Sequence, residues 1–302
     1  MSFSALPNDL LLIIAECTEA QRDLSALTRC NHRLHHLLCN LLYTNNIRRF
    51  GSSGLVWAAV HGRLSVVQRM VGMGANIETR DESGWTPLDL AARNGHYAVV
   101  KLLLETGAED QLYERHRWTP LCAAADGGYT RIVQLLLGAD SMSGEFNADS
   151  PRRAINPEPR SGEELLLQML FPKKGDSGNN SDVDLSIPLF LAAKNGHTAV
   201  ASLLLADRRV HVNYQDASQR TPLMWAVSHS HAKTVKLLLE NGADPSIEDC
   251  FNHTALLTAA SDGNDGIVRI LLAHNGSDPN CKDNKGDTPL TEAAKRGHVR
   301  VR

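Results

Sequence analysis

One phrase returns along this chain at a nearly constant interval, and that interval limits what the chain can fold into. Its fixed point is a leucine, and successive leucines lie 33 or 34 residues apart, except for one interval of 68. The leucines are Leu55, Leu88, Leu121, Leu189, Leu223, Leu256 and Leu290. A short unit repeated at such a period cannot bury its own apolar faces, so neighbouring units must stack on one another.

The copy "GWTPLDLAARNGHYAVVKLLLETGA" indicates what one unit contains. Thr86 can cap a helix, and Pro87 suits the first helical position because its missing N–H is not needed there. Asn94-Gly95 ends this first helix, since glycine accepts the left-handed conformation. Apolar residues then recur at helical spacing up to Gly107. The unit is therefore predicted to be a pair of short helices.

The interval of 68 residues between Leu121 and Leu189 has room for one more unit. We interpret residues 151–185 as a degraded repeat that keeps "ELLLQMLF" as its second helix and has lost most of its first, because Pro157 and Pro159 disrupt a helix interior. Two polar stretches, 139–163 and 172–186, are expected to be loop-rich insertions. The alternative is a plain insertion without repeat character.

From Gly84 to Ala108 the chain reads G-x-TPLxxAAxxGHxxVVxLLLxxGA and so resembles the ankyrin repeat, a unit of about 33 residues with a T-P-L-H-x-A signature. The resemblance covers residues 53–302, with about seven clear repeats and a truncated last one. It implies an all-α solenoid with short β-hairpin fingers, a concave face that binds proteins, and no catalysis. One departure is Ser230, which replaces the turn glycine and predicts a strained or altered turn.

The N-terminal residues 4–48 do not share the period. "LPNDLLLII" followed by "DLSALTRCNHRLHHLL" resembles the F-box, although His32-Arg33-Leu34 stands where an aromatic residue is usual. F-box followed by ankyrin repeats is similar to a group of fungal proteins, and the resemblance implies docking on the Skp-type adaptor of a cullin–RING ubiquitin ligase. The adaptor-binding residues would be Leu6, Pro7, Leu10, Leu11, Leu24, Leu27 and Leu34. The alternative is a helix pair that only caps the repeat stack.

The composition favours a reduced intracellular protein, in the cytoplasm or alternatively the nucleus. A net charge of −3 gives no electrostatic reason to bind nucleic acid. The six cysteines are scattered without a C-x-x-C pair, so neither disulfides nor zinc is expected. The apolar N-terminal stretch is too short and too charged to span a membrane.

Histidine is frequent, with 13 residues, but the repeat explains several of them. His96, His197, His231 and His298 share one slot after the turn and are expected to serve packing or turn hydrogen bonds. His32, His35 and His36 have metal-compatible spacing on one helix, but no further ligand completes a site. With no nucleophile or phosphate-loop motif either, we expect no metal, no cofactor and no enzyme activity.

Tryptophans and finger tips give the candidate partner surface. Trp57 and Trp225 fall in the slot of Leu90 and are predicted to be core, whereas Trp85 and Trp118 precede the capping threonines. Trp and Arg dominate binding hot spots. The expected partner-binding residues are Glu82, Ser83, Trp85, Arg115, His116, Trp118, Arg220, Phe251 and His253.

Two functions follow from the sequence. In the first, the chain is the substrate receptor of a Skp–cullin–F-box ligase. In the second, it is a scaffold or sequestering protein without a ligase. An ankyrin-bearing enzyme or channel would need a further domain. The last repeat, ending in "RGHVRVR", is expected to fray or to continue in a longer protein, because the face of Leu271 and Leu272 is left poorly covered.

Overall fold

A computed structural model of the chain describes residues 43, 44, 46–48, 52–108, 119–140 and 185–298. The predicted F-box helices at 4–42 and the predicted degraded repeat at 151–184 therefore lie outside the described residues. The chain divides into two compact units, residues 1–109 and 110–302, and each is described by itself. None of the helices in the described ranges is long and apolar enough to cross a membrane.

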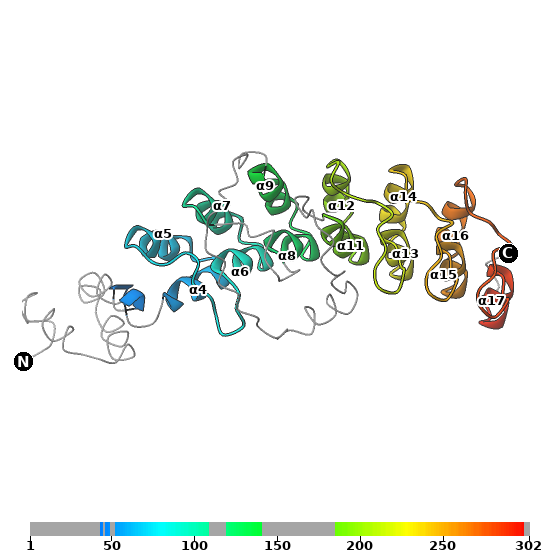
Figure 1. Cartoon of the computed structure of the whole chain (residues 1–302), viewed down its shortest axis with the longest axis horizontal. Coiled ribbons are helices and arrows are strands. Elements are labelled where there is room, and N and C mark those ends of the chain that lie inside the picture. The colour runs from blue at the N-terminus through cyan, green and yellow to red at the C-terminus, as the bar shows by residue number, and fades with distance from the viewer. Residues whose placement is uncertain (1–42, 45, 49–51, 109–118, 141–184, 299–302) are drawn as a thin grey trace, which may run out of the picture. The chain divides into compact units, whose positions relative to one another are not determined.

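In residues 52–108, the part of the first unit described as repeats, the chain forms two helical hairpins (Figure 1). Helices α4 (Ser53–Val60) and α5 (Leu64–Gly72) form the first, and α6 (Pro87–Arg93) and α7 (Tyr97–Glu105) form the second. Within this unit α4 packs on α6 and α5 packs on α7. The first helices therefore stack on first helices and the second on second, as the repeat requires.

The second unit continues the same order of short helices (Figure 1). First helices pack on first helices, and second helices on second helices. Its helices are α8 (Pro120–Asp126), α9 (Thr130–Asp140), α11 (Ser186–Lys194), α12 (Thr198–Leu205), α13 (Pro222–Ser228), α14 (Ala232–Glu240), α15 (Ala255–Ser261), α16 (Asp265–Leu272) and α17 (Pro289–Lys295).

The predicted start and stop signals are confirmed in the copy from Gly84 to Ala108. The Thr86 side chain accepts a hydrogen bond from the Asp89 backbone N–H, and Pro87 is the first residue of α6. Gly95 and Gly107 have the left-handed backbone that ends each helix, with φ of 75° and 89°. The same threonine cap opens α8, α13, α15 and α17.

The histidines after the turns join consecutive repeats, as expected. In the second unit, the Nε2 atom of His231 lies 2.9 Å from the carbonyl oxygen of Lys194, in the preceding repeat. The His231 ring covers Gly196, where an added β-carbon would lie 2.6 Å from Cγ of His231. The same arrangement pairs His96 with Gly62, His197 with Gly128 and His298 with Gly263.

Ser230 occupies this glycine slot and has a left-handed backbone with φ of 62°, so the strained turn predicted there is confirmed. The next repeat places Asn264, not a histidine, in the slot of His231. The Asn264 side chain instead caps its own helix, α16, and accepts a hydrogen bond from the Ile267 N–H at 3.3 Å. A side chain is therefore tolerated at Ser230 because no ring covers it.

The repeat before residues 141–184 packs directly on the repeat after them. Helix α8 contacts α11, and α9 contacts α12. His197 and Asn195 hydrogen-bond the backbone carbonyl of Asp126 at 2.9 Å and 3.2 Å. The two helix pairs are therefore adjacent in the stack, and the degraded repeat predicted at 151–185 stays a prediction, because residues 141–184 lie outside the described residues.

The predicted β-hairpin fingers differ from the observed loops: the described ranges contain no β-strand. Each finger is a tight turn closed by a single backbone pair, such as Asp249 N–H to the His253 carbonyl at 3.0 Å. Neighbouring fingers are joined by isolated bonds, such as Cys250 N–H to the Ser218 carbonyl at 3.0 Å. One pair per finger is too short to form a strand ladder.

Candidate partner-binding surface

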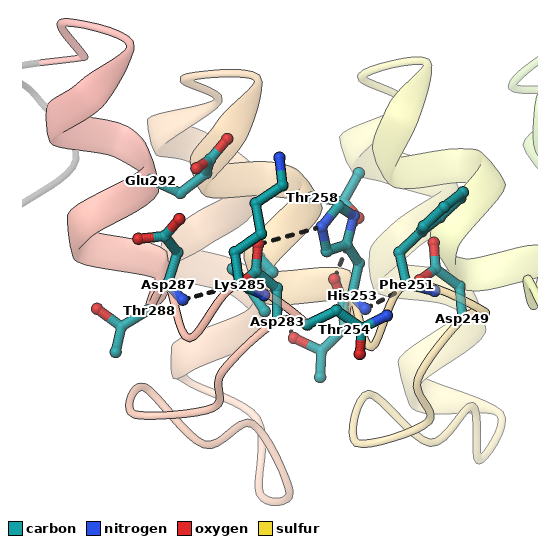
Figure 2. A network of polar contacts seen from close by, with 12 residues as sticks. Asp249, Phe251, His253, Thr254, Thr258, Asp283, Lys285, Asp287, Thr288 and Glu292 are labelled. Atoms are coloured by element: carbon teal, nitrogen blue, oxygen red, sulfur yellow. Dashed lines mark hydrogen bonds and ion pairs between the residues drawn. The ribbon is translucent and has the colours of Figure 1, made fainter.

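Each described finger is built on an aspartate that lies five residues before the capping threonine, and Asp216, Asp249 and Asp283 of these are buried. In the finger of residues 249–253, Oδ1 of Asp249 accepts the backbone N–H groups of Phe251 and His253, both at 2.9 Å (Figure 2). Asp81, Asp216 and Asp283 accept the equivalent pairs in their own fingers. The aspartate satisfies donors that the turn would otherwise leave unpaired, and so fixes the conformation of the tip.

We call residues 216–220, 249–253 and 283–287 of the second unit the finger row. Bonds between adjacent fingers hold the row together, since the Asn284 N–H donates to the Phe251 carbonyl at 3.3 Å. Phe251 stands at the tip of the middle finger with 60% of its surface exposed. Its ring lies 6.1 Å from that of His253. The row is therefore a fixed ridge that carries an exposed aromatic side chain.

The far end of the finger row is a polar network (Figure 2). His253 Nε2 lies 3.7 Å from Oδ2 of Asp283, and Lys295 pairs with Asp287. The backbone N–H of Asp287 is the main cause that lowers the pKa of Asp283 below its ordinary value, with help from Lys285 and His253. Because the lowered pKa keeps Asp283 ionised, this end of the row presents acidic groups that are already paired within the chain.

The near end of the finger row, at residues 216–220, is cationic and aromatic. Trp225 donates its indole N–H to Oδ2 of Asp216 at 2.9 Å. The Arg220 guanidinium carbon lies 4.8 Å from the Trp225 ring centroid, and the Lys194 ammonium nitrogen lies 5.8 Å from it. The His229 ring stacks on the same indole at a centroid distance of 5.7 Å. Three basic side chains therefore surround one half-buried tryptophan.

The structure brings together three of the expected partner-binding residues. Arg220, Phe251 and His253 lie on two consecutive fingers of the finger row. In the first unit, Glu82 and Ser83 are exposed at a finger tip, and Trp85 is half-buried with Arg93 5.8 Å above its ring. Outside the described residues lie Arg115, His116 and Trp118, and every residue expected to bind the adaptor.

The prediction that Trp57 and Trp225 are core residues was wrong for Trp57, which is 52% exposed, and incomplete for Trp225, which is half-buried. The slot they share is covered when it holds Leu90 or Leu191, whose side chains are buried. An indole is larger than a leucine side chain, so it extends beyond the cover that the neighbouring helices supply. Trp57 stacks on His61 at a centroid distance of 4.5 Å instead.

Sequence reasoning missed the finger aspartates and two of the three basic residues around Trp225, Lys194 and His229. The aspartates had a detectable signal, because Asp81, Asp216, Asp249 and Asp283 each precede a capping threonine by five residues. Lys194 had none, since it meets Trp225 only after two repeats have stacked, whereas His229 lies four residues after Trp225 and its i, i+4 spacing was a local signal. No group of His, Cys, Asp or Glu side chains in the described ranges could hold a metal ion.

Comparison with known proteins agrees with this geometry. The family model described as "Ankyrin repeats (3 copies)" matches residues 24–112, 55–149, 159–249 and 241–301. Over 83 residues the chain is 37% identical to the 26S proteasome non-ATPase regulatory subunit 10 of Dictyostelium discoideum, with 28% of this chain and 36% of that protein covered. Over 112 residues it is 30% identical to the putative ankyrin repeat protein YahD of Escherichia coli K12, covering 35% of this chain and 55% of that one. The chain therefore spans about a third to a half of these relatives.

Two solved structures share the fold. The ankyrin repeat domain of human ASB11 superposes with a TM-score of 0.62 at 24% identity, covering 82% of this chain and 94% of that one. The ankyrin repeat domain of Bcl-3, titled a unique member of the IkappaB protein family, gives a TM-score of 0.57 at 25% identity, covering 82% and 96%.

Proposed function

This chain belongs to the ankyrin-repeat family, whose repeats bind protein targets, and from that premise we propose that it is a non-catalytic scaffold that holds a partner on the finger row. The observation that carries the proposal is Phe251. The same position in the other described fingers is Ser83, Ser218 or Lys285, so the fold does not need an aromatic residue there. An exposed aromatic side chain on a fixed ridge is typical of a recognition site.

The expected residues on either side of Phe251 fit this proposal. His253 lies beside it on the same finger, and Arg220 lies on the preceding finger. Glu82, Ser83 and Trp85 of the first unit, and Arg115, His116 and Trp118, stay candidate partner-binding residues on the sequence alone. Since no nucleophile, metal or cofactor enters this proposal, the chain would act by holding its partner. The intracellular location remains part of the proposal.

Affinity capture from cells tests the finger row. We expect the double variant Phe251→Ala/His253→Ala to retain about a tenth or less of the partner captured by the wild-type chain, because truncating central anchors removes most of the binding energy. The matched control is Leu272→Ala, which removes another exposed apolar side chain, on α16 and away from the row. Equal capture by the wild type and the folded double variant would refute the finger row as the partner site.

We further propose, from the sequence of residues 4–48 alone, that this scaffold is the substrate receptor of a Skp–cullin–F-box ubiquitin ligase. Leu6, Pro7, Leu10, Leu11, Leu24, Leu27 and Leu34 would dock the Skp adaptor, and the repeats would hold the target at a high effective concentration near the ligase. Two observations support the alternative, a simple cap. The family match begins at residue 24, and the Asn46 side chain accepts the Gly54 N–H of the first repeat at 2.8 Å.

A pull-down with purified Skp adaptor distinguishes an adaptor-binding F-box from a simple cap of the repeat stack. The wild-type chain is expected to bind the adaptor, and Leu6→Ala/Pro7→Ala is expected to lose binding while Leu272→Ala keeps it. If the folded wild-type chain captures no adaptor, the ligase proposal fails and residues 4–48 are assigned to the cap. Partner binding by the finger row is unaffected by either result.

A further inference from the structure

We propose that the basic side chains around Trp225 form a site for an acidic segment of the partner protein. This inference rests on the proposed scaffold function and adds the chemistry of the segment that is bound. The site consists of Lys194 at the end of α11, Arg220 on the finger before α13, Trp225 within α13, and His229 directly after α13. It shares Arg220 with the near end of the finger row and adds basic side chains to that end.

The fold positions these groups before any partner arrives. The hydrogen bond from the Trp225 indole to Asp216 fixes the plane of the ring. Arg220 and Lys194 lie 4.8 Å and 5.8 Å from its centroid, within the range of cation–π attraction. Arg220 also donates to the hydroxyl of Ser228, one helical turn beyond Trp225. The cations are therefore held at one place, so little side-chain entropy remains to be lost on binding.

The two cations of the site have no direct ion-pair partner within the described part of the chain. Lys194 and Arg220 form no ion pair there, whereas Arg269, Lys295 and Arg296 pair with carboxylates. Asp216 is nearby, but its two oxygens already accept the Ser218, Arg220 and Trp225 N–H groups. Both cations can therefore still form ion pairs with carboxylates of a partner.

Arg220 adds a second, independent observation. A guanidinium has five N–H donors. In the described part of the chain its side chain donates to the Ser228 hydroxyl, and its Nε is buried without a hydrogen-bond partner. An Arg that lacks acceptors binds carboxylates strongly, because the pair forms charge-assisted hydrogen bonds. Aspartate and glutamate side chains of an extended segment supply these carboxylates, and the neighbouring Trp225 and Phe251 offer apolar contact to the rest of the segment.

Fluorescence anisotropy with defined peptides tests the site on the full chain. The probe is a fluorescein-labelled peptide of alternating glycine and glutamate, beside its glycine–lysine counterpart. We expect the glutamate peptide to bind, and the double variant Lys194→Gln/Arg220→Gln to weaken that binding at least about tenfold. The matched control Lys233→Gln/Lys236→Gln removes the same charge from exposed positions on α14 and should change affinity by less than about twofold.

The single variant Lys194→Gln should lose part of the affinity without touching the Arg220–Ser228 bond, so an unfolded double variant does not end the test. The inference is overturned if the glutamate peptide fails to bind the wild-type chain, or if the site and control variants lose affinity equally. Binding of the lysine peptide with the same affinity also overturns it. If the peptides fail while the finger row still captures a partner, the acidic-segment inference falls and the scaffold function stands.

Discussion

Replacing Gly196 with alanine is expected to lower the free energy of unfolding by about 3 kcal/mol, because two penalties act at one position. Gly196 has a left-handed backbone with φ of 70°, which a β-carbon disfavours. The added carbon would also meet the His231 ring, 2.6 Å from its Cγ. The ring must move, and its hydrogen bond to the Lys194 carbonyl is lost. Urea unfolding followed by circular dichroism measures the change.

Gly242→Ala is the matched control for this substitution. Gly242 also has a left-handed backbone, with φ of 86°, but no atom lies within 4 Å of its added β-carbon. We expect it to lose only about 1–2 kcal/mol, the backbone penalty alone. The difference between the two variants is therefore the contribution of the ring contact.

A double-mutant cycle with His231→Ala isolates that contact. In the wild type, His231→Ala removes a hydrogen bond between repeats. In the Gly196→Ala background it also removes the clash, so its cost should be smaller by about 1 kcal/mol or more. Equal destabilisation by Gly196→Ala and Gly242→Ala, or strict additivity in the cycle, would show that the histidine does not constrain the glycine.

The repeat lattice was predictable from sequence because each of its signals is local. A threonine before proline, as at Thr86, and a glycine after the helix, as at Gly95, decide conformation within a few residues. Ser230 could be recognised as strained for the same reason, since the equivalent position in other repeats is a glycine with positive φ. The shared slot of His231 also indicated a structural role, although not which carbonyl it would contact.

The features that decide the candidate site were not local, and the sequence predicted them poorly. Whether an indole in the slot of Leu90 is buried depends on how far the neighbouring helices extend over it, which is why Trp57 is exposed. Lys194 meets Trp225 only because α11 packs on α13. The direct contact of α8 with α11, across the interval of 68 residues, also depends on packing that no spacing reveals.

Asp216→Ala is the second substitution with a large expected effect, about 3 kcal/mol of lost stability, because three partly buried donors would lose their acceptor together. Asp216 is only 6% exposed and accepts the Ser218 and Arg220 backbone N–H groups and the Trp225 indole N–H. Asp249 accepts the two backbone donors of its own finger, so Asp249→Ala should cost about 2 kcal/mol. Urea unfolding of both variants gives the comparison.

Asp216→Asn distinguishes the contribution of the hydrogen bonds within the finger from that of the hydrogen bond to the Trp225 indole. One amide oxygen can still accept the two backbone N–H groups, but the amide nitrogen is a donor and cannot accept the indole N–H. Asp216→Asn should therefore lose less stability than Asp216→Ala, and the loss should largely vanish in a Trp225→Phe background, where no indole N–H needs an acceptor. If Asp216→Asn is as harmful with phenylalanine as with tryptophan at 225, the indole bond contributes nothing. In that case the Trp225 ring is held by Arg220, Lys194 and packing alone.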